Sequence, residues 1–140
     1  MRVIILRGAG DSGKSTTLNL VFEELISSRY TRTISYQTPI GNPINRDFEA
    51  EVILTDNRII AFYTMGDYDK KYIVKAIEEF RNKKIDVLIM ASNQNLNTHF
   101  DFVVNNFPHI IVNKTVSNPV IDTDNQRNNF QDCGNILSLL

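Results

Sequence analysis

The hydrophobic positions at the start of the chain change from a strand pattern to a helix pattern. The run Val3 to Leu6 is short, apolar and β-branched, and a glycine-rich segment follows it, which predicts a buried parallel strand. From Lys14 to Ser28 apolar residues recur at helical spacing, while Glu23 and Glu24 fall on the other face. The pattern therefore predicts a strand, a glycine-rich turn and a helix in direct succession.

Strand and helix patterns alternate along the rest of the chain. Residues 31 to 50 contain two prolines and a glycine and keep no period, so we expect a long loop with at most one short strand. The pair Asp56-Asn57 tolerates a positive φ between two β-rich runs, which predicts an antiparallel hairpin. The expected strands are Glu51 to Thr55, Arg58 to Thr64, Asp86 to Ala91 and His109 to Asn113, and the expected helices are Asp69 to Asn82, Leu96 to Asn106 and, interrupted near Gly134, Asp124 to Leu140.

This alternation indicates the fold class and the edge of the sheet at which ligands bind. We expect an α/β protein with a mostly parallel five-stranded sheet, helices on both faces and right-handed crossovers. The chain of 140 residues is long enough for one such domain, spanning residues 1 to 140. Ligands of these sheets bind beyond the carboxyl ends of the strands. The residues expected there are Gly8 to Ser15, Met65 to Asp67, Ser92, Asn93, Asn113 and Lys114.

Composition narrows the class of protein without identifying a partner. Apolar residues make up 42% of the chain, charged residues 22%, and the formal net charge is -1, which is typical of a soluble globular protein. This balance does not indicate a nucleic-acid or membrane surface. No apolar stretch suits a signal peptide or a membrane span, and Cys133 is the only cysteine. We therefore expect a cytoplasmic protein without an internal disulfide.

The glycine-rich segment fits a phosphate-binding pattern. Gly8-Ala9-Gly10-Asp11-Ser12-Gly13-Lys14-Ser15 matches G-x-x-x-x-G-K-[ST] between a predicted strand and a predicted helix, although such a turn can also arise by chance. Its glycines allow backbone N–H groups and the positive end of the helix to face an anion. Lys14 would neutralise the outer phosphates, and the Ser15 hydroxyl would bind magnesium. The expected nucleotide-binding residues are Gly8, Ala9, Gly10, Asp11, Ser12, Gly13, Lys14, Ser15 and Thr16.

The stretch GAGDSGKSTT resembles the phosphate loop of P-loop NTPases and is similar to that of heterotrimeric G-protein alpha subunits. The order of elements also resembles that of GTPases, with Asn113-Lys114 after the last strand. This resemblance implies the three-layer P-loop NTPase fold, with ATP or GTP and Mg²⁺ as ligands. The chain departs from the GTPase pattern, because Tyr63 occupies the acid position of D-x-x-G and Val116 the guanine-reading position of N-K-x-D. We therefore expect ATP rather than a guanine-specific site, with Asn113-Lys114 as the polar end of a strand.

A magnesium ion held by Ser15 calls for an acidic second anchor, usually at the end of a strand beside the loop strand. Asp67 is the candidate, and Gly66 before it would let the backbone approach the γ-phosphate. The alternative is that Asp67 caps the helix expected to begin near Asp69. A GTPase-like switch would instead bring the hydroxyl of Thr33 or Thr38 to the metal.

The sequence predicts binding of a nucleoside triphosphate with magnesium and slow hydrolysis, in which Lys14 and Asp67 act catalytically. One alternative is a small-molecule or nucleotide kinase, although residues 113 to 129 contain few of the basic residues typical of a kinase lid. Another is a non-catalytic module that regulates a protein partner, which the missing acid at Tyr63 favours. Turnover of bound nucleotide distinguishes this module from both enzymes.

Overall fold

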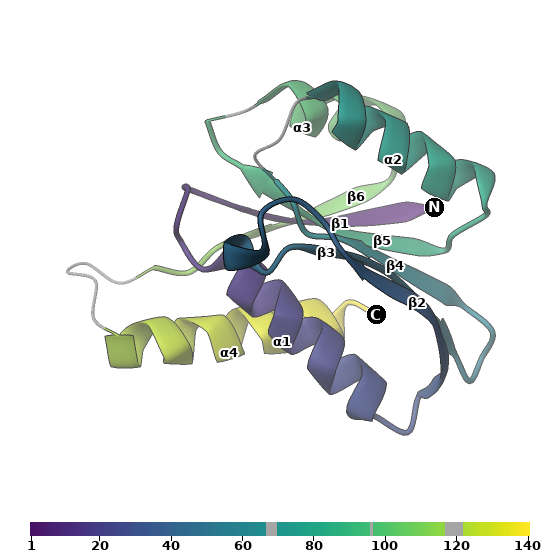
Figure 1. The fold of residues 1–140 in the computed structure, drawn as a ribbon, viewed down its shortest axis with the longest axis horizontal. Coiled ribbons are helices and arrows are strands. Elements are labelled where there is room, and N and C mark those ends of the chain that lie inside the picture. The colour runs from purple at the N-terminus through teal and green to yellow at the C-terminus, as the bar shows by residue number, and fades with distance from the viewer. Residues whose placement is uncertain (67–69, 96, 117–121) are drawn as a thin grey trace.

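A computed structural model describes residues 1 to 66, 70 to 95, 97 to 116 and 122 to 140 (Figure 1). The predicted magnesium anchor, Asp67, lies outside these ranges. The strands are β1 (Arg2–Gly8), β2 (Thr31–Pro39), β3 (Phe48–Leu54), β4 (Ile59–Tyr63), β5 (Val87–Asn93) and β6 (His109–Asn113). The helices are α1 (Lys14–Ser27), α2 (Lys70–Asn82), α3 (Asn97–Asn106) and α4 (Asp122–Ser138), with a 3-10 turn η1 (Pro43–Asn45) between β2 and β3.

Six strands form one mixed sheet in the order β2-β3-β4-β5-β1-β6 (Figure 1). The strands β4, β5, β1 and β6 pair in parallel, whereas β3 pairs antiparallel with both β2 and β4. The expected three-layer P-loop NTPase fold with a mostly parallel five-stranded sheet is therefore wrong, both in the number of strands and in the pairing at one edge. The order also places β5 between β4 and β1, so the strand that leads toward Asp67 is not a direct neighbour of β1.

The two strands at the antiparallel edge account for this error. The predicted loop over residues 31 to 50 is occupied mainly by β2 and by the start of β3. Most side chains of β2 are exposed at this edge of the sheet, and its sequence lacks the apolar alternation of a half-buried strand. The predicted hairpin is confirmed, since β3 and β4 pair antiparallel around Asn57, whose φ is 70°.

Helices cover both faces of the sheet, with α1 and α4 on one side and α2 and α3 on the other (Figure 1). The central strand β1 contributes to both cores: Ile4 and Leu6 belong to one buried cluster, and Val3 and Ile5 to the other. All four side chains are fully buried, and burial of each is worth about 1.5 to 3 kcal/mol. This packing fixes the end of β1, from which the glycine-rich segment begins.

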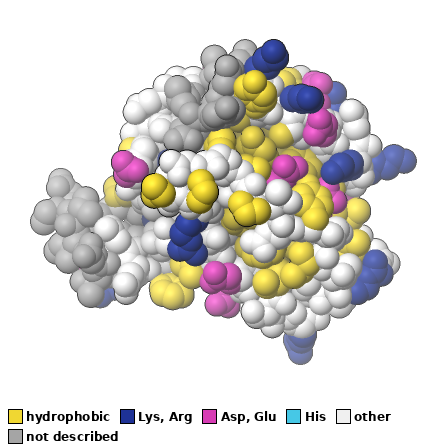
Figure 2. All heavy atoms as spheres, viewed as in Figure 1, with side chains coloured by type: hydrophobic (Ala, Val, Ile, Leu, Met, Phe, Trp, Pro, Cys, Tyr) yellow, Lys and Arg dark blue, Asp and Glu magenta, His cyan; other side chains and the backbone are white. Residues whose placement is uncertain are grey.

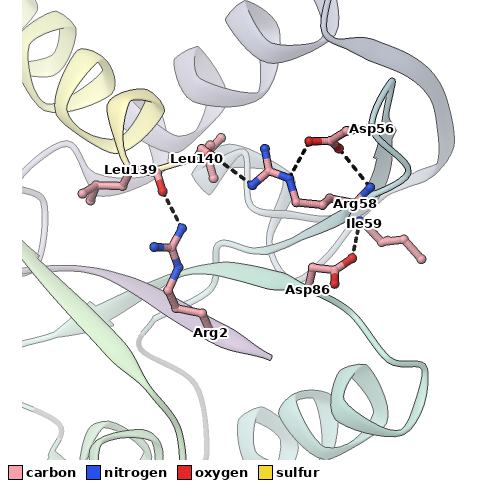
Figure 3. A network of polar contacts seen from close by, with 7 residues as sticks. All are labelled: Arg2, Asp56, Arg58, Ile59, Asp86, Leu139 and Leu140. Carbon is pink, nitrogen blue, oxygen red and sulfur yellow. Dashed lines mark hydrogen bonds and ion pairs between the residues drawn. The ribbon is translucent and has the colours of Figure 1, made fainter.

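Polar contacts hold together the amino ends of the parallel strands (Figure 3). Arg58 Nε lies 2.8 Å from Asp56 Oδ2, and the Ile59 N–H donates to Asp86 Oδ2 over 2.8 Å. Arg58 also donates to the main-chain oxygen of Leu140 over 2.7 Å. Both acids therefore stabilise strand ends, at the opposite end of the sheet from the glycine-rich segment that follows β1.

The last helix, α4, is continuous, so the predicted interruption near Gly134 is wrong. A Cβ atom at Gly134 would meet nothing within 4 Å, which indicates that this glycine neither makes a close contact nor breaks the helix. The neighbouring Cys133 packs into the core under α1 and α4. Burial, with a smaller contribution from Glu24, raises the pKa of its thiol to about 11.

The surface carries charges of both signs. On the face in Figure 2, most Lys and Arg side chains lie near the outline, and Asp and Glu side chains are scattered over the same face. Among the helices that the structure describes, none is long and apolar enough to cross a membrane.

Candidate functional site

A cavity of about 400 Å³ opens at the carboxyl end of β1, over the glycine loop, which we define as Gly8 to Ser15. One wall is the loop and the start of α1. The opposite wall comes from the segment between β2 and β3, from the end of β4 and from the end of β5. The lining residues are Gly10, Asp11, Ser12, Gly13, Lys14, Ser15, Thr16, Ile44, Asn45, Asp47, Thr64, Gly66 and Asn93.

The Lys14 ammonium is held over the loop by main-chain oxygens. Its Nζ donates to the carbonyl of Ala9 over 2.6 Å and to that of Gly8 over 3.2 Å. The Ser12 hydroxyl also donates to the Ala9 carbonyl, over 2.7 Å. Of the nine predicted binding residues, Gly8 and Ala9 are thus absent from the cavity lining, and they position the lysine instead.

The start of α1 leaves backbone donors for a ligand. Its N-cap is Gly13, which has a φ of 91° and makes no side-chain cap, and the first turn contains no acidic residue. A helix that begins in this way presents unpaired N–H groups and a partial positive charge, which together favour an anion. The structure therefore contains the predicted turn and the predicted start of the helix. Lys14 and the amino end of α1 line the same cavity.

Close packing beneath the loop explains two of its glycines. A Cβ atom at Gly8 would lie 2.7 Å from Lys114 Cβ, and one at Gly13 would lie 2.8 Å from Asn129 Oδ1. Both distances are shorter than real Cβ contacts, and Gly13 also needs its positive φ. The same Asn129 oxygen accepts a hydrogen bond from Thr17 Oγ1 over 3.1 Å. The loop therefore rests directly on Lys114, which follows β6, and on Asn129 of α4.

A buried ion pair lies at the centre of this support. Lys114 Nζ is 2.9 Å from Asp132 Oδ2, and each side chain is only 1% exposed. The Asp132 carboxylate also accepts the N–H and the hydroxyl of Thr115, over 2.8 and 2.7 Å. Lys114 is therefore more than a polar residue at the end of a strand. Sequence reasoning missed Asp132, because its position in α4 gives no sign that it meets the residues that follow β6.

Sequence reasoning also missed Asp47, an acid on the cavity wall. Ser15 Oγ donates to Asp47 Oδ1 over 2.6 Å, and Thr64 Oγ1 donates to the same oxygen over 3.1 Å. Asp47 is only 6% exposed. The alternation of apolar and acidic residues from Phe48 to Val52 could have identified β3 and placed Asp47 directly before it.

The other predicted ligands are not brought to the cavity. Thr33 and Thr38 lie in β2, where Thr38 pairs with Glu49, and neither lines the cavity. Gly66 does line it, and a Cβ atom there would lie 2.9 Å from the backbone of Ala91. The segment after β4 therefore approaches the cavity at Gly66, and Asp67 follows outside the described residues.

Comparison with protein-family models, curated proteins and solved structures finds no significant match to this chain. In the described ranges, no three His, Cys, Asp or Glu side chains gather in a way that could hold a metal ion. Magnesium does not need such a cluster, because it is usually held by one or two carboxylates together with substrate phosphates and waters. The cavity and its lining residues are therefore the features that bear on function.

Proposed function

We propose that this chain binds a nucleoside triphosphate with Mg²⁺ at the glycine loop and hydrolyses it slowly. The observation that carries the proposal is the cavity of about 400 Å³ on which the Lys14 ammonium and the start of α1 converge. Its volume falls within the range of roughly 300 to 1,000 Å³ that is typical of small-molecule sites. A cation and unpaired backbone donors in one concave site favour a ligand with several negative charges.

Each group has a separate task in this proposal. The loop N–H groups bind the phosphate oxygens, and Lys14 neutralises the outer phosphates and stabilises the charge that develops during phosphoryl transfer. The residues fit Mg²⁺, because the Ser15 hydroxyl and the Asp47 carboxylate both line the cavity. When bound, the ion supplies further neutralisation of the phosphoryl oxygens.

We expect the site to discriminate little in favour of guanine over adenine nucleotides. Val116 is 60% exposed at the position where a carboxylate would read the two guanine N–H donors, and Lys114 is held by Asp132 beneath the loop. ATP should therefore compete with a labelled nucleotide as well as GTP does, or better. A hundredfold preference for GTP in this competition titration would contradict the expectation, since a site that pairs the base donors discriminates by orders of magnitude.

Hydrolysis is tested by phosphate release from ATP and from GTP in the presence of Mg²⁺. We expect release above the rate in buffer alone, and we expect it to disappear in Lys14→Ala, which lacks the charge that stabilises the transferring group. Nucleotide that binds but stays intact would contradict hydrolysis and favour a regulatory module.

A further inference from the structure

The Asp47 carboxylate contacts the hydroxyl that the proposed function gives to the metal. Ser15 Oγ donates to Asp47 Oδ1 over 2.6 Å, and both residues line the cavity. We infer that Asp47 is the protein carboxylate that anchors Mg²⁺ beside Ser15, directly or through a metal-bound water. This inference rests on the proposed function, because it places the metal in the same cavity.

The direction of this hydrogen bond prepares Ser15 for a cation. A serine hydroxyl has one hydrogen to donate and two lone pairs to offer. With its hydrogen committed to Asp47, the Ser15 hydroxyl keeps its lone pairs for a metal ion. Asp47 therefore orients the hydroxyl in addition to supplying a negative charge. One carboxylate and one hydroxyl are enough protein ligands for Mg²⁺, because phosphates and waters complete its coordination.

Asp47 is fixed in place by the strands behind it. Thr64 Oγ1 donates to Asp47 Oδ1 over 3.1 Å, and this hydroxyl in turn accepts the N–H of Phe48 over 2.8 Å. The carboxylate is thus tied to the start of β3 and to the residue after β4, and it is 6% exposed. A buried carboxylate beside a polyphosphate is costly unless a cation lies between the two charges. A divalent ion meets this requirement.

The other described positions are weaker candidates for the carboxylate that anchors Mg²⁺. Among the described lining residues, Asp11 is the second acid, and it is exposed within the loop itself. The two strands that flank β1 end in Asn93 and Asn113, which carry amides and not carboxylates. The usual position for a magnesium-binding acid, the end of a strand beside the loop strand, is therefore without a carboxylate in the described part of the chain.

The test compares ATP affinity with and without Mg²⁺ in Asp47→Asn. Asparagine keeps an oxygen that can accept the hydrogens of Ser15 and Thr64, so the substitution removes chiefly the charge. Calorimetry should show ATP affinity in EDTA within about threefold of the parent, whereas the gain on adding Mg²⁺ should fall at least tenfold. A thermal melt checks that the variant is folded at the titration temperature.

Three variants provide the controls. Glu79→Gln removes an exposed acid of α2 that does not line the cavity and should keep the Mg²⁺ gain, and Asp47→Glu should recover part of that gain by restoring the charge. An unchanged gain in Asp47→Asn would overturn the inference, and a loss confined to Asp67→Asn would transfer the role to Asp67. Equal losses of ATP affinity with and without Mg²⁺ in Asp47→Asn would also overturn the inference, since they would show that Asp47 has a structural role. If the parent does not bind ATP in EDTA or in Mg²⁺, the proposed function itself is wrong.

Discussion

Replacing Lys114 with methionine is expected to lower the free energy of unfolding by about 3 kcal/mol. Breaking a buried ion pair typically costs about 3 to 5 kcal/mol, because the remaining charge stays buried without its partner. We expect the lower value here, since the Asp132 carboxylate would still accept two hydrogen bonds from Thr115. Urea denaturation of the parent and of Lys114→Met measures the difference.

A surface ion pair offers the matched control. Lys83 Nζ lies 3.1 Å from Glu51 Oε1, a distance close to that of the buried pair, but the Lys83 side chain is 52% exposed. Lys83→Met should cost less than about 1 kcal/mol, because water screens exposed pairs. Similar losses for the two lysines would mean that the Lys114 pair does not have the stabilising role assigned to it.

Lys14→Ala is expected to weaken triphosphate binding at least tenfold. Loss of a charge-assisted contact to a phosphate costs about 1.5 to 3 kcal/mol, which corresponds to a factor of ten or more in affinity. The fold should persist, because the Lys14 side chain lines an open cavity and contributes to neither hydrophobic cluster. Calorimetric titration with ATP, together with a thermal melt, measures both effects.

The control for this variant is Lys75→Ala, which removes an exposed lysine of α2 that does not line the cavity. Its ATP affinity should equal that of the parent. If Lys14→Ala also binds ATP as the parent does, the glycine loop does not hold phosphate. If both variants lose ATP affinity equally, Lys14 contributes to binding through the overall charge of the protein and not through a specific contact with phosphate.

Local sequence patterns were sufficient for the loop and its flanking elements. The apolar run that ends before Gly8, the motif itself and the helical spacing after Lys14 are contiguous, so the strand, turn and helix follow from neighbouring residues. The sequence analysis predicted a break at Gly134 because glycine has a low helix propensity. This small cost does not end a helix that is stabilised by packing. The stability of α4 comes instead from its contacts with α1.

Sheet order and the second wall of the cavity could not be predicted in the same way. Which strand lies beside β1 depends on pairings between distant segments, and no local pattern shows that β5 enters between β4 and β1. Asp47 reaches Ser15 across 32 residues of sequence, and Asp132 reaches Thr115 across 17. Neither acid stands in a sequence motif that points to a partner, since Asp47 lies between Arg46 and Phe48 and Asp132 between Gln131 and Cys133, so only the fold reveals that they meet the loop or its support.

The central claim is that the glycine loop holds the phosphates of a nucleotide. It is tested most directly by titrating ATP with Mg²⁺ into isotopically labelled protein and following the backbone amide signals by NMR. We expect saturable shifts that are largest for the amides of Gly10 to Ser15, because these residues line the cavity and their N–H groups would bind the phosphate oxygens. Shifts confined to another part of the surface, such as β2, or no saturable shift at all, would contradict it.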